Sequence, residues 1–245
     1  TEVATGVNAS SSRSARVWHS SVLDDTSNWC LGRPQTTQVI ASHSLTDGNA
    51  VTRTTGRTWD GLTCRLTQSG EEPGNSTLQV TTTPGYDGFG NVNSVAVAGI
   101  GMTTRPTTGY WGTSGQSLRT VTNALSQTTT LNWNDSVGEM ATLTDPNGLA
   151  TSWGYDAFGR RTSEVRPDLT STAWTYASCG TCDPRVRYVV QQQSKTDAGA
   201  VIRTDESRYD AFDQEVTRLT PQAAGGSSEV DRTRDALGRV TRTHV

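Results

Sequence analysis

Hydrophobic residues are scarce in this sequence, at 32% of 245 residues. Ordinary globular domains have roughly 45–50%, although that range also counts glycine. Disorder is excluded, because charged residues make up only 18%, the net charge is -3, and seven Trp and six Tyr are spread along the chain. Threonine and glycine fill the gap and favour strands and turns. The composition therefore predicts an all-β protein with a thin core.

Lysine occurs only once, at Lys195, and arginine forms no basic block. With a net charge of -3, this excludes the electrostatic footprint of a nucleic-acid-binding protein. No apolar run approaches the roughly 18–20 residues that span a membrane. The chain starts without an initiator Met or a signal peptide and stops inside an alternating pattern, GRVTRTHV. We expect it to be a piece of a longer polypeptide whose ends are held by neighbouring material.

Motifs that carry catalysis are also lacking. The sequence contains no Gly-x-Ser-x-Gly elbow, no Walker loop and no dinucleotide fingerprint. Its histidines, His19, His43 and His244, are far apart and have no metal-ligand spacing. We expect no catalytic residue, no cofactor and no metal site, and therefore no enzyme.

What the sequence does contain is a repeat. Residues 155–159 read YDAFG, residues 86–90 read YDGFG, residues 209–213 read YDAFD, and a weaker copy, RDALG, covers residues 234–238. Aligned on the closing residue, the copies recur every 21 to 33 residues. The anchors are Thr63, Gly90, Gly115, Gly138, Gly159, Gly180, Asp213 and Gly238. A proline follows eight residues after three of them, at Pro146, Pro167 and Pro221. Such a period indicates a structural repeat.

Each repeat is predicted to be a β-hairpin. Residues 152–155, 172–176 and 240–243 alternate with the period of a strand. Asp-Ala-Phe-Gly suits a tight turn in which the Asp carboxylate accepts a backbone N–H and the Gly takes a positive φ. The expected turn residues are Tyr86, Asp87, Gly90, Asp135, Gly138, Tyr155, Asp156, Gly159, Tyr209, Asp210, Asp235 and Gly238.

A catalytic alternative exists for the repeated aspartates Asp87, Asp156, Asp210 and Asp235. Equivalent copies at one turn position favour turn caps over acids or bases, because a catalytic carboxylate needs a partner and a perturbed environment. Two departures from the pattern are expected to matter. Thr63 makes the unit at residues 59–62 a doubtful member, and the long interval before Asp213 predicts an extra loop or hairpin around residues 191–193.

The four cysteines leave alternatives open. Cys179 and Cys182 form a CxxC pair, which is compatible with a redox pair, half a zinc site, a local disulfide or reduced thiols. A zinc site would need two more ligands, and the sequence has no second CxxC. Cys30 and Cys64 are candidates for a second disulfide, consistent with an exported protein.

The recurring Tyr-Asp-x-Phe/Leu-Gly-Arg, followed by Pro-Asp or by Asp-Pro-Asn-Gly, resembles the YD repeats of Rhs-family proteins. The Arg is present after Gly159 and Gly238 and absent after Gly90 and Gly138. The resemblance covers residues 81–245, the predicted repeat region; residues 1–80 are expected to be divergent β-rich repeats. Polymorphic toxins, the insecticidal toxin-complex C component and teneurin-like proteins belong to this family. The resemblance implies repetitive antiparallel hairpins that form part of a hollow β-shell.

The resemblance also implies a function: a structural shell segment of a secreted or cell-surface bacterial protein that encloses and delivers a C-terminal toxin domain. Its expected partners are neighbouring repeats, or other copies of the chain, at both sheet edges, and the enclosed toxin. The alternative is an adhesin that binds cell-surface carbohydrate, for which an exposed aromatic patch is needed. The best candidates for that patch are Tyr110 and Trp111.

Overall fold

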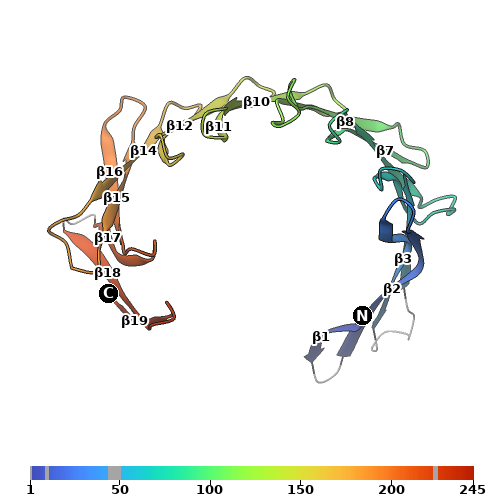
Figure 1. The fold of residues 1–245 in the computed structure, drawn as a ribbon, viewed down its shortest axis with the longest axis horizontal. Coiled ribbons are helices and arrows are strands. Elements are labelled where there is room, and N and C mark those ends of the chain that lie inside the picture. Colours follow the sequence, from blue (N-terminus) through green and yellow to red (C-terminus); the bar gives the residue numbers. More distant parts are fainter. Residues whose placement is uncertain (1, 9–10, 44–50, 223–225) are drawn as a thin grey trace. The chain divides into compact units, whose positions relative to one another are not determined.

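The computed structural model describes residues 2–8, 11–43, 51–222 and 226–245. This part of the chain forms β-strands and no helix (Figure 1). The first nine strands are β1 (Glu2–Asn8), β2 (Ser11–Asp25), β3 (Cys30–His43), β4 (Val51–Trp59), β5 (Leu66–Glu71), β6 (Val80–Tyr86), β7 (Val92–Gly99), β8 (Arg105–Tyr110) and β9 (Thr120–Thr122). The remaining strands are β10 (Thr128–Asn134), β11 (Glu139–Thr144), β12 (Ala150–Tyr155), β13 (Arg161–Val165), β14 (Ser171–Ser178), β15 (Tyr188–Lys195), β16 (Val201–Tyr209), β17 (Glu215–Pro221), β18 (Ser227–Arg234) and β19 (Val240–His244).

The chain divides into two compact units, residues 1–128 and residues 129–245. In the first unit each strand pairs antiparallel with the next one in the sequence. The second unit follows the same rule from β10 to β19. Each unit is thus a run of hairpins, which confirms the predicted all-β, antiparallel fold class. The predicted contrast between residues 1–80 and 81–245 concerns the regularity of the repeat and stays a prediction.

The strands expected from the alternating pattern are present. Residues 152–155 lie in β12, residues 172–176 in β14, and residues 240–243 in β19. Of the loop or hairpin expected around residues 191–193, the loop is wrong, because these glutamines lie inside β15 and pair with residues 204–206 of β16 in the β15–β16 hairpin. The extra length of this interval instead goes into longer strands and into the loop before β15. Polar glutamines are accommodated in a strand because the sheet exposes both of its faces in part.

A register shift marks the motif hairpins. It falls between Gly85 and Tyr86 in β6, between Gly154 and Tyr155 in β12, and between Arg208 and Tyr209 in β16. A bulge inserts one extra residue at the turn and increases the local twist of the strand pair. The motif therefore sets the twist of successive hairpins as well as their closure.

Very few side chains are buried in these units. Among residues whose burial is described, the buried apolar side chains are Cys30, Val186 and Val216, which are at most 5% exposed. Within each unit the strands lie in a single layer (Figure 1), so most side chains keep one side toward solvent. This accounts for the low hydrophobic content, since a single layer has no second sheet against which to bury a face.

Candidate functional site

The turn at Asp156 shows how the motif works. Its backbone N–H donates to the carbonyl of Arg160 at 2.9 Å, and the N–H of Gly159 donates back to the carbonyl of Asp156 at 3.0 Å. The Asp156 carboxylate accepts the N–H of Phe158 at 2.9 Å and that of Arg160 at 3.0 Å. Gly159 has φ +77°, a conformation that L side chains rarely adopt. Five residues thus close the hairpin and satisfy its backbone donors.

The other copies repeat this geometry. The carboxylates of Asp87, Asp210 and Asp235 each accept two backbone N–H groups, two and four residues further on, at 2.8 to 3.0 Å. Asp145, in the Asp-Pro-Asn-Gly turn after β11, does the same at 2.8 and 2.9 Å. The turns before and after β12, at Asp145 and Asp156, therefore share one design.

The structure adds three details to the predicted turns. In the turn that contains Asp135, the Oδ1 of Asn134 accepts the N–H of Ser136, and the Asn134 backbone carbonyl accepts those of Val137 and Gly138. The unit at Asp60 does form a capped turn, but one residue longer, so that Cys64 rather than Thr63 has the positive φ of +57°. Gly180 is absent from the described positive-φ residues, and the cap in its loop is Asp183, which accepts the N–H of Arg185. Asn and a shifted Asp provide the same acceptor oxygen, which a motif search misses.

Gly159, in the turn after β12, and Leu169, in the turn after β13, form a matched pair of positive-φ residues for a mutational test. Gly159 has φ +77°, and an added Cβ there would meet only the Cβ of Val137, at 3.9 Å. Leu169 holds the equivalent place with φ +66° and a side chain that is 64% exposed. We expect Gly159→Ala to lower the free energy of unfolding by about 1 kcal/mol and Leu169→Gly to raise it by about 0.5 kcal/mol. Urea unfolding measures both, and two changes of the same sign would contradict the proposed role of φ.

The electrostatics of the turn carboxylates follow from these bonds. Partial desolvation opposes ionisation of Asp156, but hydrogen bonds from Arg160 and Phe158 outweigh it and hold its pKa below the ordinary value. The backbone N–H and the side chain of Arg239 lower the pKa of Asp235 in the same way. A general acid at neutral pH needs the opposite shift. These carboxylates are therefore built to stay ionised and to accept hydrogen bonds.

In several of the hairpins an aromatic side chain reaches back to the strand that precedes it. The hydroxyls of Tyr86, Tyr155 and Tyr176 donate to the carbonyls of Leu66, Met140 and Arg161, each at 2.9 Å. The indole N–H groups of Trp59 and Trp111 make the same kind of bond to Pro34 and Val92, at 3.2 and 2.9 Å. These contacts link neighbouring hairpins through a side chain in addition to the strand pairing. We call them the aromatic ties.

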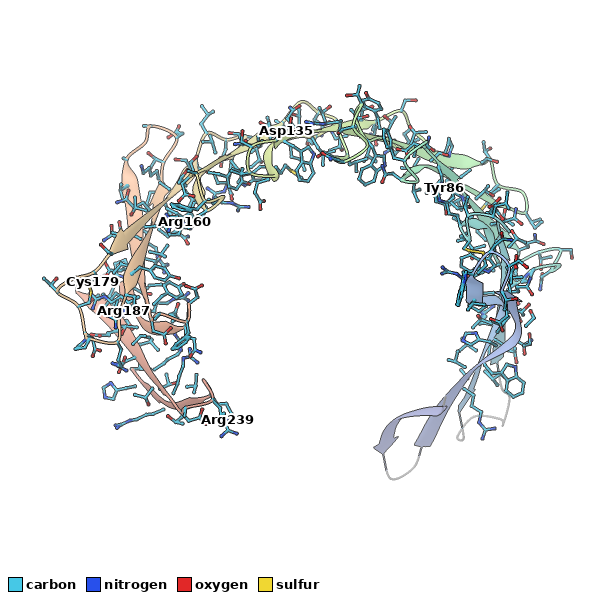
Figure 2. The ribbon with its side chains drawn as sticks, in the orientation of Figure 1. Tyr86, Asp135, Arg160, Cys179, Arg187 and Arg239 are labelled. Carbon is cyan, nitrogen blue, oxygen red and sulfur yellow. A yellow bond between two sulfur atoms is a disulfide. The ribbon has the colours of Figure 1, made fainter. Side chains whose placement is uncertain are left out.

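One face of the second unit gathers aromatic rings and arginines. The register places Trp153 opposite Glu164, and Glu164 opposite Thr172, so Trp153 and Trp174 share a face. The Arg161 guanidinium lies over both rings, 5.7 and 5.9 Å from their centroids. Arg160, labelled in Figure 2, lies 4.3 Å from the centroid of the Tyr176 ring. Each such contact contributes about 0.5–1 kcal/mol at an exposed site, so ring and cation contacts replace part of the missing core.

Tyr188 and Tyr209 continue this face. Their rings stack with centroids 5.0 Å apart and an angle of 10° between the planes. The Tyr188 hydroxyl donates to the Asp213 carboxylate at 3.0 Å. Desolvation and this hydrogen bond raise the pKa of Tyr188 to about 12. Asp213 thus replaces the usual glycine at φ +59° and uses its carboxylate to fix a tyrosine of the neighbouring strand.

The candidate ligand-surface aromatics, Tyr110 and Trp111, have different environments. Tyr110 is 54% exposed. Trp111 uses its indole N–H in an aromatic tie to Val92 and lines a cavity of about 150 Å³ with residues of β7 and β8. The pair therefore does not form an aromatic patch in which both side chains are free for a ligand, and its proposed role in binding stays a prediction.

All four cysteines are in disulfides, Cys30–Cys64 and Cys179–Cys182. Cys30–Cys64 joins the tips of the β2–β3 and β4–β5 hairpins, with a sequence separation of 34. Cys179–Cys182 lies within the loop before β15, with a separation of 3. Among the alternatives that the sequence left open for the cysteines, the structure contains the two disulfides. The part of the chain that is described contains no cluster of potential metal ligands. None of its described segments is a helix able to cross a membrane.

Comparison with known proteins agrees with this geometry. Residues 135–171, from the turn after β10 to the start of β14, match the family model described as RHS Repeat. No curated protein matches the chain. Several solved structures share its fold at low sequence identity.

The crystal structure of TcdB2-TccC3-TEV matches with a TM-score of 0.55 and 14% identity over 97% of this chain and 13% of that chain. TcdB2-TccC3 without the hypervariable C-terminal region matches with a TM-score of 0.54 and 14% identity, over 89% of this chain and 12% of that chain. The Photorhabdus luminescens Tc holotoxin pore with a mutated TccC3 matches with a TM-score of 0.50 and 14% identity, over 86% of this chain and 13% of that chain. The chain thus spans about an eighth of the length of these proteins, and at such identity the likeness concerns the fold. Residues 135–171 thus resemble the RHS repeat, and the fold of the chain resembles that of the TccC3-containing structures.

Proposed function

We propose that this chain is a structural segment of an Rhs-type shell that encloses and delivers a C-terminal toxin domain. The observation that carries the proposal is the repeated hairpin, closed by an aspartate and tied by an aromatic side chain to the hairpin before it. In this arrangement the polar side chains of the motif are used to hold the wall together. The fold shared with TccC3-containing structures supports the same conclusion.

A single layer of strands needs stabilising interactions in addition to the turn motif. Few side chains are buried, so each hairpin depends on strand pairing, on the aromatic ties and on the disulfides. The end strands β1 and β19 also carry backbone groups on their outer edges that invite pairing. Neighbouring repeats at those edges are the partners that fit, and an enclosed toxin domain is the partner that fits the shell as a whole. Two disulfides suit an oxidising location, so we place the protein in the secreted or cell-surface fraction.

The carbohydrate-binding alternative lacks a supporting observation. A sugar site built on stacking needs rings that are free on the surface. Trp111 is engaged in a tie to Val92. Trp153, Trp174 and Tyr176 lie against arginines, and Tyr188 and Tyr209 stack on each other. We therefore do not propose carbohydrate binding as a second function.

The test uses the longer polypeptide that contains this chain. Its C-terminal region is digested with a protease of broad specificity, beside the same region produced without the repeats. We expect the enclosed region to be cut at least about tenfold more slowly, because cleavage then requires opening of the shell. Equal rates of cleavage would contradict enclosure, and saturable glycan binding that Tyr110→Ala abolishes would favour the adhesin instead.

A further inference from the structure

We propose that Cys179–Cys182 is a site of reversible thiol–disulfide exchange with small thiols, and that Cys30–Cys64 is a structural disulfide that resists such exchange. The two disulfides differ in the three properties that govern exchange: access of the attacking thiolate, stability of the thiolate that leaves, and the structure that remains after reduction.

Access differs first. Cys30 is fully buried, with 0% exposure, so attack on its sulfur is blocked. Attack on the partly exposed Cys64 would leave a buried thiolate at Cys30. The Cys30 sulfur lies 3.7 Å from the carbonyl oxygen of Gly61 and 3.8 Å from that of Asn28. Burial and adjacent carbonyl oxygens disfavour a thiolate, so this leaving group is poor.

The second disulfide has neither obstacle. Cys179 and Cys182 are both partly exposed, and the two residues between them, Gly180 and Thr181, are exposed. A thiolate that leaves from either position can be hydrated. A reagent thiolate attacks one Sγ, the other cysteine leaves as a thiolate, and a second reagent thiol resolves the mixed disulfide. Two electrons and two protons pass to the protein, and the reagent becomes its own disulfide.

The loop that carries this disulfide is held independently of it. The N–H of Cys179 donates to Arg187 O, that of Val186 to Asp183 O at 2.8 Å, and that of Arg187 to Tyr209 O at 2.7 Å. Figure 2 labels Cys179 and Arg187 close together at this loop. Because these bonds keep the loop closed, the two thiols stay near each other after reduction. A short connection gives a high effective concentration, so re-oxidation is fast and the exchange is reversible.

Reduction has a defined structural consequence. Arg185 in this loop binds Asp183 at 3.0 Å and reaches Asp231 of β18 at 3.3 Å, and the neighbouring Val186 is buried. The loop thus connects the β14–β15 hairpin to β18 through this ion pair. Opening the disulfide removes one restraint from this loop, so the amides of Val186 and Arg187 open to hydrogen exchange more often, although their hydrogen bonds still keep the loop closed in most molecules and the hairpins persist.

The experiment treats the chain with reduced dithiothreitol, quenches with acid at intervals, and blocks free thiols with N-ethylmaleimide for peptide mass spectrometry. We expect Cys179–Cys182 to be reduced at least about tenfold faster than Cys30–Cys64, with an unchanged far-UV circular dichroism spectrum and complete re-oxidation by oxidised dithiothreitol. A variant with Cys30→Ala and Cys64→Ala should retain this rate. Hydrogen exchange at Val186 and Arg187 should rise, with that at Phe158 unchanged.

Three outcomes overturn the proposal. Cys30–Cys64 is reduced first or at the same rate; or Cys179–Cys182 is reduced only as the β-sheet signal is lost; or the reduced pair fails to re-form in folded protein. In the variant with Cys179→Ala and Cys182→Ala, the slow rate of Cys30–Cys64 should be unchanged, so a changed rate would show that the two sites are not independent.

Discussion

Replacing Cys30 and Cys64 by alanine will lower the free energy of unfolding of the first unit by about 4 kcal/mol. A cross-link between residues 34 apart in sequence removes much of the conformational freedom of the unfolded chain, and the loss scales with the logarithm of the closed loop. The first unit has little buried apolar surface with which to compensate. Urea unfolding followed by tryptophan fluorescence measures the change, since Trp29 and Trp59 lie near this disulfide in the sequence and at the same hairpin tips.

The matched control removes the other disulfide. Cys179→Ala with Cys182→Ala should cost only about 2 kcal/mol, because its loop has a separation of 3 and is held by other bonds. The comparison keeps the chemistry of the substitution the same and changes only loop length and location. An equal or greater loss in the control would mean that loop length does not determine how much each disulfide stabilises the chain.

The chain will lose stability steeply as the pH falls below about 5. Hydrogen bonds to backbone N–H groups and nearby side chains lower the pKa of the turn carboxylates Asp25, Asp60, Asp87, Asp145, Asp156, Asp168, Asp183 and Asp235 below the ordinary value of 3.8. A lowered pKa in the folded state means that the stabilisation is complete above the unfolded pKa and is lost as the pH falls through the folded one. Because many turns depend on the same chemistry, the losses accumulate between about pH 5 and pH 2.

Urea midpoints measured from pH 6 to pH 2.5 test this. Much of the loss should persist in 0.5 M salt, because backbone N–H groups bind these carboxylates and screening weakens chiefly the exposed ion pairs, such as those of Asp156 and Asp235 with arginine. Asp87→Asn should keep much of the turn at low pH, as Asn123 and Asn134 already accept backbone N–H groups in this chain. A urea midpoint that stays flat from pH 6 to pH 3 would rule out the carboxylate caps as a main source of stability.

The turn motif was the part of the site open to prediction. The assignment of Asp87, Asp156, Asp210 and Asp235 to turn positions needs only residues within a five-residue segment. Asn134 was not predicted as a cap, although its side-chain oxygen accepts the N–H of Ser136 in the turn that contains Asp135. Leu169 was not predicted at all, since nothing in the residue type indicates a positive φ, which is imposed there by the register of β13 and β14.

Sequence by itself determined the all-β class, the period of the hairpins and the turn chemistry, because strand alternation and Asp-x-x-Gly closure are local properties of the chain. Only the tertiary structure decided which carbonyl each aromatic tie reaches, that Cys30 pairs with Cys64, and that Arg161 lies over the rings of both Trp153 and Trp174. Those contacts join residues on different strands, often more than ten positions apart in sequence. They depend on the register and twist that neighbouring hairpins impose on one another, and no short segment of sequence specifies either.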